Sequence, residues 1–137
     1  MKLRIVVVAL LMLTFAEFAV AQDKSKAAEA ASEAWLKFVD SGDYSQSWVE
    51  ASSLFKAAVK EKDWERQVRA ARQPLGALFS RKLKSAEYAT KLPGAPDGQY
   101  VVIQYDSSFA NQKSAVETVT PMLDKDGQWR VSGYYIK

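Results

Sequence analysis

The chain contains neither histidine nor cysteine, and these two absences exclude many kinds of active site. Without histidine there is no Ser-His-Asp or Cys-His catalysis, no imidazole general base, and no imidazole-bound zinc or copper. Without cysteine there is no disulfide, thiol nucleophile, iron–sulfur cluster or lipoprotein anchor. Glycine-rich phosphate loops of the G-x-G-x-x-G or G-x-x-x-x-G-K-S/T type are also missing. The sequence therefore predicts a fold held by its own core, with no cofactor and no metal ion.

The first 21 residues have the features of a cleavable signal peptide. A basic start, Met1 to Arg4, precedes an apolar run from Ile5 to Ala16, and the small residues Ala19-Val20-Ala21 precede Gln22. A membrane-spanning helix needs about 20 apolar residues, whereas Glu17 interrupts this run earlier. We therefore expect cleavage between Ala21 and Gln22, a periplasmic or secreted protein, and no stable membrane anchor after cleavage.

Cleavage would leave a small chain of modest charge. Removing 21 of the 137 residues leaves 116, which fits one domain with one core. Two basic residues and one acidic residue leave with the signal peptide, so the net charge falls from +3 to +2. Domains that bind nucleic acid usually concentrate more positive charge on one face, so we expect no nucleic-acid partner. The expected organisation is a signal peptide (1–21), a loose polar leader (22–26) and one domain (27–137), with the oligomeric state open.

The first half of this domain has helical periodicity. Helix formers dominate residues 27–40, where apolar side chains recur at three- and four-residue spacing. Gly42 suits the end of that helix and Asp43 can cap the next. We expect further helical segments at 44–51, after a cap at Ser52 or Ser53, and at 61–73, where Pro74 and Gly76 end helical structure.

The second half has the period and the turn residues of strands. We expect strands at 78–90, 99–109, 114–123 and 128–136, the last with Trp129, Val131 and Tyr135 on one face. Residues 92–98 are rich in proline and glycine, and Asp126-Gly127 is a hairpin signal. Helices followed by consecutive strands indicate an α+β fold. We expect N-terminal helices packed on one face of a four-stranded antiparallel meander.

A row of arginines is the one concentration of positive charge. Arg66, Arg69 and Arg72 share a helix face, and Arg81 follows at the start of the first strand. One interpretation is a surface that binds an anion or an acidic partner. The alternatives are a solvated helix face, or guanidinium groups that carboxylates hold inside the fold.

Two carboxyls and two tyrosines are the candidates for a catalytic site. Glu117 lies in a β-branched strand and, if it lined a cavity, its pKa would rise and it would serve as an acid or base. Asp106 is a second candidate base, and Tyr100 and Tyr105 are candidate hydrogen-bond donors. The alternative for Glu117 is exposure to water, or an ion pair with Arg72 or Arg81.

Several strings of residues resemble a bacterial family of exported proteins known as domain of unknown function 4019. The likeness covers roughly Ala27 to Lys137, and its most distinctive parts are Arg72-Gln73-Pro74-Leu75-Gly76, Ser80-Arg81, Leu92 to Val102, Glu117 to Thr120, and Asp126 to Tyr134. The resemblance implies no catalytic residue. The order of helices and strands is also similar to the cystatin-like and nuclear-transport-factor-like cone folds, which include enzymes such as ketosteroid isomerases as well as binding modules.

Three hypotheses for function follow from these features. The first is a non-enzymatic exported domain that binds a small ligand or an envelope protein. The second is a cofactor-free isomerase, lyase or hydrolase that uses a cavity carboxyl and a tyrosine. The third is an envelope factor that acts through its basic row. Burial of those arginines in internal ion pairs would count against the third, and exposure of both candidate carboxyls would count against the second.

Overall fold

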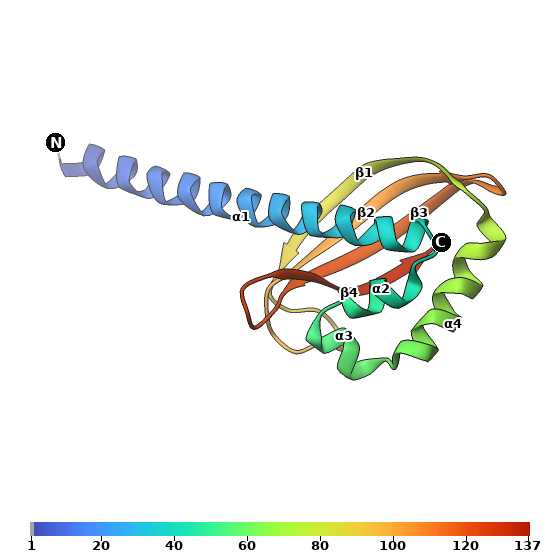
Figure 1. Ribbon diagram of the computed structural model, residues 1–137. Helices are drawn as coiled ribbons and strands as arrows, with labels where there is room; N and C mark the ends of the chain where they lie inside the picture. Colours follow the sequence, from blue (N-terminus) through green and yellow to red (C-terminus); the bar gives the residue numbers. More distant parts are fainter. Residues whose placement is uncertain (1) are drawn as a thin grey trace.

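The computed structural model describes the backbone of residues 2–137 and the side chains of residues 20–137. Four α-helices and a 3-10 turn come first: α1 (Lys2–Asp40), α2 (Tyr44–Val49), α3 (Ser53–Ala58), α4 (Glu61–Arg72) and η1 (Gln73–Leu75). Four strands follow: β1 (Leu78–Ala89), β2 (Tyr100–Phe109), β3 (Gln112–Leu123) and β4 (Trp129–Ile136). The predicted α+β class is confirmed, and the observed elements lie close to the predicted ranges except that α1 begins well before residue 27 (Figure 1).

The strands form one antiparallel sheet in the order β1-β2-β3-β4, as predicted for a meander. The turn between β3 and β4 contains Asp126-Gly127, and Gly127 has a φ of +83°, where a side chain would be strained. The pairing of β3 with β4 changes register between Val119 and Pro121. This irregularity determines which side chains at the end of β4 face the core and which face away from it.

The short helices begin and end at the residues that the sequence indicates. Gly42, with a φ of +78°, follows the end of α1. The Asp43 side chain accepts a hydrogen bond from the amide of Gln46 and caps α2, and the Ser52 hydroxyl accepts one from the amide of Phe55 and caps α3. These stops bring α2, α3 and α4 back towards the C-terminal half of α1.

The N-terminal region differs from the expectation in one respect. Residues 22–26 are part of helix α1, so the expectation of a loose leader there is wrong. The predicted signal peptide, 1–21, lies largely outside the residues whose side chains are described, and it stays a prediction. Within the part of the chain that the structure describes, no helix combines the length and apolar character needed to span a bilayer.

The core lies between α1 and the sheet. α1 runs along one face of the sheet and contacts all four strands, whereas α2 packs on α1 and α4, and α3 packs on β4 (Figure 1). The predicted packing of N-terminal helices on a four-stranded meander is confirmed. An aromatic cluster joins the layers, because Trp35 packs against Trp64 and Tyr134, and Trp64 against Phe55, with ring centroids 4.9 to 6.0 Å apart.

Candidate functional site

The Glu117 carboxylate is fully buried, on the face of β3 that points towards the helices. It accepts two hydrogen bonds from the Arg81 guanidinium, from Nε to Oε1 at 2.7 Å and from Nη2 to Oε2 at 3.1 Å. The Ser107 hydroxyl donates to Oε1 at 2.6 Å and the Tyr134 hydroxyl donates to Oε2 at 2.5 Å. Four donors from β1, β2 and β4 therefore surround this carboxylate. Its pairing with Arg81 is one of the alternatives that the sequence left open.

Asp40, the last residue of α1, extends this arrangement to the helices. Its two carboxylate oxygens accept hydrogen bonds from Arg81 at 2.8 Å each, and Oδ1 also accepts from Arg72 at 2.9 Å. Arg72 Nη1 lies 3.9 Å from Glu117 Oε2, and its guanidinium lies over the Phe109 ring. We call these four charged residues, with Ser107 and Tyr134, the ionic network. Its two positive and two negative charges balance.

The surroundings of the ionic network keep Asp40 and the two arginines charged and Tyr134 neutral. Burial acts to raise the pKa of Asp40, but the hydrogen bonds and the attraction of Arg81 and then Arg72 outweigh it, so that pKa is lowered. Burial acts to lower the pKa of Arg81, and Asp40 and Glu117 more than reverse this. Burial raises the pKa of Tyr134 strongly and the Glu117 charge raises it further. Tyr134 is therefore a hydrogen-bond donor to a carboxylate.

This geometry does not suit a general base. A base must take a proton from a substrate within hydrogen-bond reach, whereas both Glu117 oxygens already accept from internal donors. Neither of the two surface hollows described below is lined by Glu117. In the part of the chain that the structure describes, no three acidic side chains converge to bind a metal ion. The ionic network is arranged to join α1, α4 and the sheet.

The other catalytic candidates do not assemble with Glu117. The Asp106 side chain is 62% exposed and lies 4.0 Å from Lys84. Tyr100 is buried, but its hydroxyl donates to the carbonyl oxygen of Pro96 at 2.6 Å. Tyr105 pairs with Glu117 across the β2–β3 ladder, yet its buried hydroxyl makes no hydrogen bond to a described residue. Burial raises the pKa of Tyr105.

The tyrosine that does contact Glu117 is Tyr134, which the sequence reasoning missed. Simple alternation along β4 predicted Tyr135 on the face of Trp129 and Val131. The register shift opposite Thr120 inserts an extra residue, so Tyr134 pairs with Val119 and faces the core, while Tyr135 is 51% exposed. The available signal was Gly133, because a glycine inside a strand often marks a bulge.

The predicted basic row is divided between the surface and the interior. Arg66 is exposed and pairs with Asp63 at 2.6 Å, and Arg69 is exposed with its guanidinium over the Tyr44 ring. Arg72 and Arg81 instead belong to the ionic network, with side chains 4% and 13% exposed. These two are not available to an external anion, so the four arginines do not form one binding surface.

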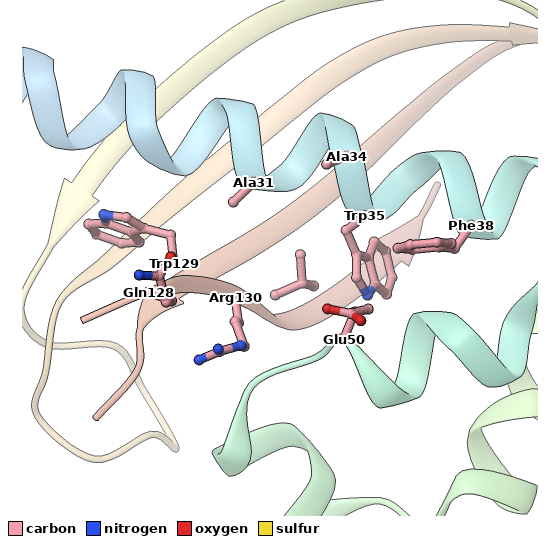
Figure 2. Close-up of a pocket in the computed structure, with 9 residues that line it drawn as sticks. Ala31, Ala34, Trp35, Phe38, Glu50, Gln128, Trp129 and Arg130 are labelled. Atoms are coloured by element: carbon pink, nitrogen blue, oxygen red, sulfur yellow. The ribbon is translucent and has the colours of Figure 1, made fainter. Parts of the chain in front are cut away.

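A small hollow lies between α1 and β4, with a volume of about 220 Å³. Figure 2 shows Ala31 and Ala34 on one side of it and Glu50 and Arg130 on the other. Its remaining lining residues are Trp35, Phe38, Gln128, Trp129 and Val131. The Arg130 guanidinium is already paired with Asp126 at 2.7 Å, and the Trp35 indole N–H donates to the carbonyl oxygen of Ser47. This hollow is smaller than most ligand sites, which occupy about 300–1,000 Å³.

A larger hollow lies between α3, the β1–β2 loop and β4, and we call it the α3–β4 groove. Its volume is about 450 Å³. Helix α3 and the residue after it supply Leu54, Phe55, Ala58 and Val59, the loop supplies residues 92–96, and the sheet supplies Tyr100, Thr120 and residues 132–135. None of these residues carries a charge. Apolar and aromatic lining with a few hydroxyl groups is typical of binding sites.

A family model described as "Protein of unknown function (DUF4019)" matches residues 31–134, which is most of the chain. The comparison with curated proteins finds no match.

Proposed function

The chain belongs to the DUF4019 family, and we propose that it is an exported, non-enzymatic binding domain of the cell envelope. The α3–β4 groove is the proposed binding site. The main support is that both oxygens of the buried Glu117 carboxylate already accept hydrogen bonds from internal donors. The groove, in contrast, is open, uncharged and large enough for a ligand. The ionic network then has a structural role, and recognition takes place at the surface.

The proposal of export is supported by the N-terminal sequence. A basic start, an apolar run and Ala19-Val20-Ala21 form the pattern that signal peptidase recognises. Cleavage before Gln22 would leave α1 with its last five turns or so, which include the part that packs on the sheet. We further propose that the domain is a cystatin-like cone, since a helix lies across a four-stranded meander.

An enzymatic role is the second candidate, and one observation favours it. The hydrogen bond between Tyr134 and Glu117 is a carboxyl–tyrosine pair, as a cofactor-free isomerase, lyase or hydrolase would need. Two arginines share the same site, however, and Arg81 holds both carboxylate oxygens. A substrate would have to displace these charge-assisted hydrogen bonds, which are among the strongest in proteins.

A titration followed by nuclear magnetic resonance tests the binding proposal. The exported protein, which begins at Gln22, is titrated with a panel of small apolar fragments, and we expect amide shift changes at residues 132–135 and 92–96. The variant Ala58→Trp fills the groove and should abolish these changes. The matched control, Ala57→Trp, changes the preceding exposed residue of the same helix, which does not line the groove. Shift changes centred on Glu117 and Ser107 would instead support the enzymatic candidate.

A further inference from the structure

The two edges of the sheet differ in the charges that they carry. β1 and β4 are the edge strands. The exposed side chains of β1 include Lys82 and Lys84, and lysines on an edge strand discourage pairing with another chain. In β4 the five residues from Ser132 to Ile136 carry no charge. This part of β4 therefore has a bulge at Ser132 and Gly133 but no charged residue at the sheet edge, and it borders the α3–β4 groove.

The backbone of β4 also has free hydrogen-bonding groups at this edge. Lys137 and Val116 exchange both backbone hydrogen bonds, at 2.9 and 3.0 Å. In an antiparallel ladder such pairs alternate with pairs whose N–H and C=O groups point away from the neighbouring strand. Ile136 and Tyr134 therefore direct these groups to the open edge. Among the described residues, the one backbone donor from outside the sheet that reaches this edge is the amide of Ser52, which binds the carbonyl oxygen of Val131 at 2.8 Å.

We propose that the α3–β4 groove binds an extended, uncharged peptide segment of an envelope protein, which pairs with β4 as a fifth strand. The backbone of the segment would bond the outward groups of Tyr134 and Ile136, and every second side chain would enter the groove. The lining without charge selects apolar and hydroxyl-bearing side chains, because a charged one would lose its hydration without a partner. This inference rests on the proposed function and names the partner class of the same site.

A single strand fits this place better than the edge of a second copy. α3 stands beside β4, and the amide of Ser52 at its N-cap already bonds to Val131. A second copy would bring its own α3 and its whole sheet to the same narrow space. A peptide segment is a single strand, so no helix or further strand comes with it.

The test uses a blocked hexapeptide of alternating valine and threonine with the full-length protein. Amide hydrogen exchange is measured with the peptide at about ten times its Kd. We expect exchange at Tyr134 and Ile136 to slow about tenfold, because the free fraction of the protein falls by that factor. The same peptide with alternate amides N-methylated cannot pair and should give no protection. Tyr135→Lys should weaken binding at least about tenfold, whereas Leu83→Lys on the opposite edge should not.

Each other outcome overturns the inference, in a recognisable way. If the peptide shifts groove resonances and leaves exchange at Tyr134 and Ile136 unchanged, it binds by side chains alone, and the proposed function survives. If fragments bind the groove and the peptide does not, the inference of a peptide partner fails, but the proposed function survives. If neither binds, the proposed function fails with it. If the edge is protected without peptide and the protein sediments as a dimer, a second copy occupies the edge.

Discussion

The Tyr134 hydroxyl donates a hydrogen bond of 2.5 Å to Oε2 of Glu117, and the two residues reach each other because β4 contains an extra residue. Without the bulge opposite Thr120, position 134 would face away from the core. The same bulge turns Tyr135 outwards beside the α3–β4 groove. One irregularity of the backbone thus supplies both a donor to the ionic network and an aromatic wall for the proposed binding site.

The contribution of this hydrogen bond can be measured with Tyr134→Phe. The variant removes one of the two donors to Oε2 of a buried carboxylate and should lower the free energy of unfolding by about 1.5–3 kcal/mol. The measurement is urea denaturation followed by tryptophan fluorescence. Tyr135→Phe is the matched control, and it should change stability by no more than about 0.5 kcal/mol. Equal effects of the two variants would contradict the assignment of Tyr134 to the network.

Most of the fold could be predicted from the sequence because its signals are local. Helical periodicity, the caps at Asp43 and Ser52, and the Asp126-Gly127 turn each act within a few residues. Residues 22–26 were expected to be loose because they are polar, but they contain no glycine or proline, so nothing there ends the helix that begins before them.

The site could be predicted only in part because its members are distant in the chain. Pairing of Glu117 with Arg72 or Arg81 was foreseeable from charge, since a buried carboxylate needs a partner. The role of Asp40 was not, because only tertiary packing brings the end of α1 to β1 and α4. The α3–β4 groove depends on where a loop lies relative to a helix, and no sequence period encodes that position.

The division of the basic row predicts unequal effects of three similar substitutions. Arg72→Gln removes a buried guanidinium that pairs with Asp40, and it should destabilise the protein by about 3 kcal/mol or more. Arg66→Gln and Arg69→Gln remove exposed groups and should each cost less than about 1 kcal/mol. Urea denaturation of all three variants checks this. Similar losses of unfolding free energy in all three variants would contradict the division of these arginines between the surface and the interior.

The loss of stability at acid pH should depend in part on the carboxylate of Asp124. The hydroxyl of Ser53, helped by backbone amides of Ser53 and Lys125, lowers the pKa of Asp124 from 3.8 to about 2. Because the folded pKa is below the unfolded one, the stabilisation is complete above pH 3.8 and is lost as the pH falls towards 2. Asp124→Asn should therefore be less stable than the parent protein at pH 6.

The comparison across pH identifies the cause. The difference in unfolding free energy between Asp124→Asn and the parent should shrink between pH 4 and pH 2, as urea denaturation at several pH values would measure. Asp97→Asn is the control, since the Asp97 side chain is 74% exposed and its nearest charged partner is Lys91 at 3.8 Å. A difference that stays constant over this range would show that the charge of Asp124 is not responsible.

Export can be tested on the protein recovered from cells. Mass spectrometry of the periplasmic or secreted fraction should find a chain that begins at Gln22 and has 116 residues. Ala19→Arg places a large charged side chain in the cleavage site and should leave the precursor unprocessed. Ala27→Arg, outside the site, should be processed normally. An intact Met1 on a cytosolic molecule would contradict the proposed localisation.

A double-mutant cycle between Glu117 and Arg81 tests most directly whether Glu117 is a structural anion bound to Arg81. Urea denaturation gives the unfolding free energies of the parent protein, Glu117→Leu, Arg81→Met and the double variant. Glu117→Leu leaves Arg81 with Asp40 alone, and Arg81→Met removes the guanidinium that bonds both oxygens of the buried Glu117, so each single change should cost about 3–5 kcal/mol. The double variant should be at least about 2 kcal/mol more stable than the sum of the two losses predicts. Additive losses, or a Glu117→Leu protein as stable as the parent, would contradict the claim.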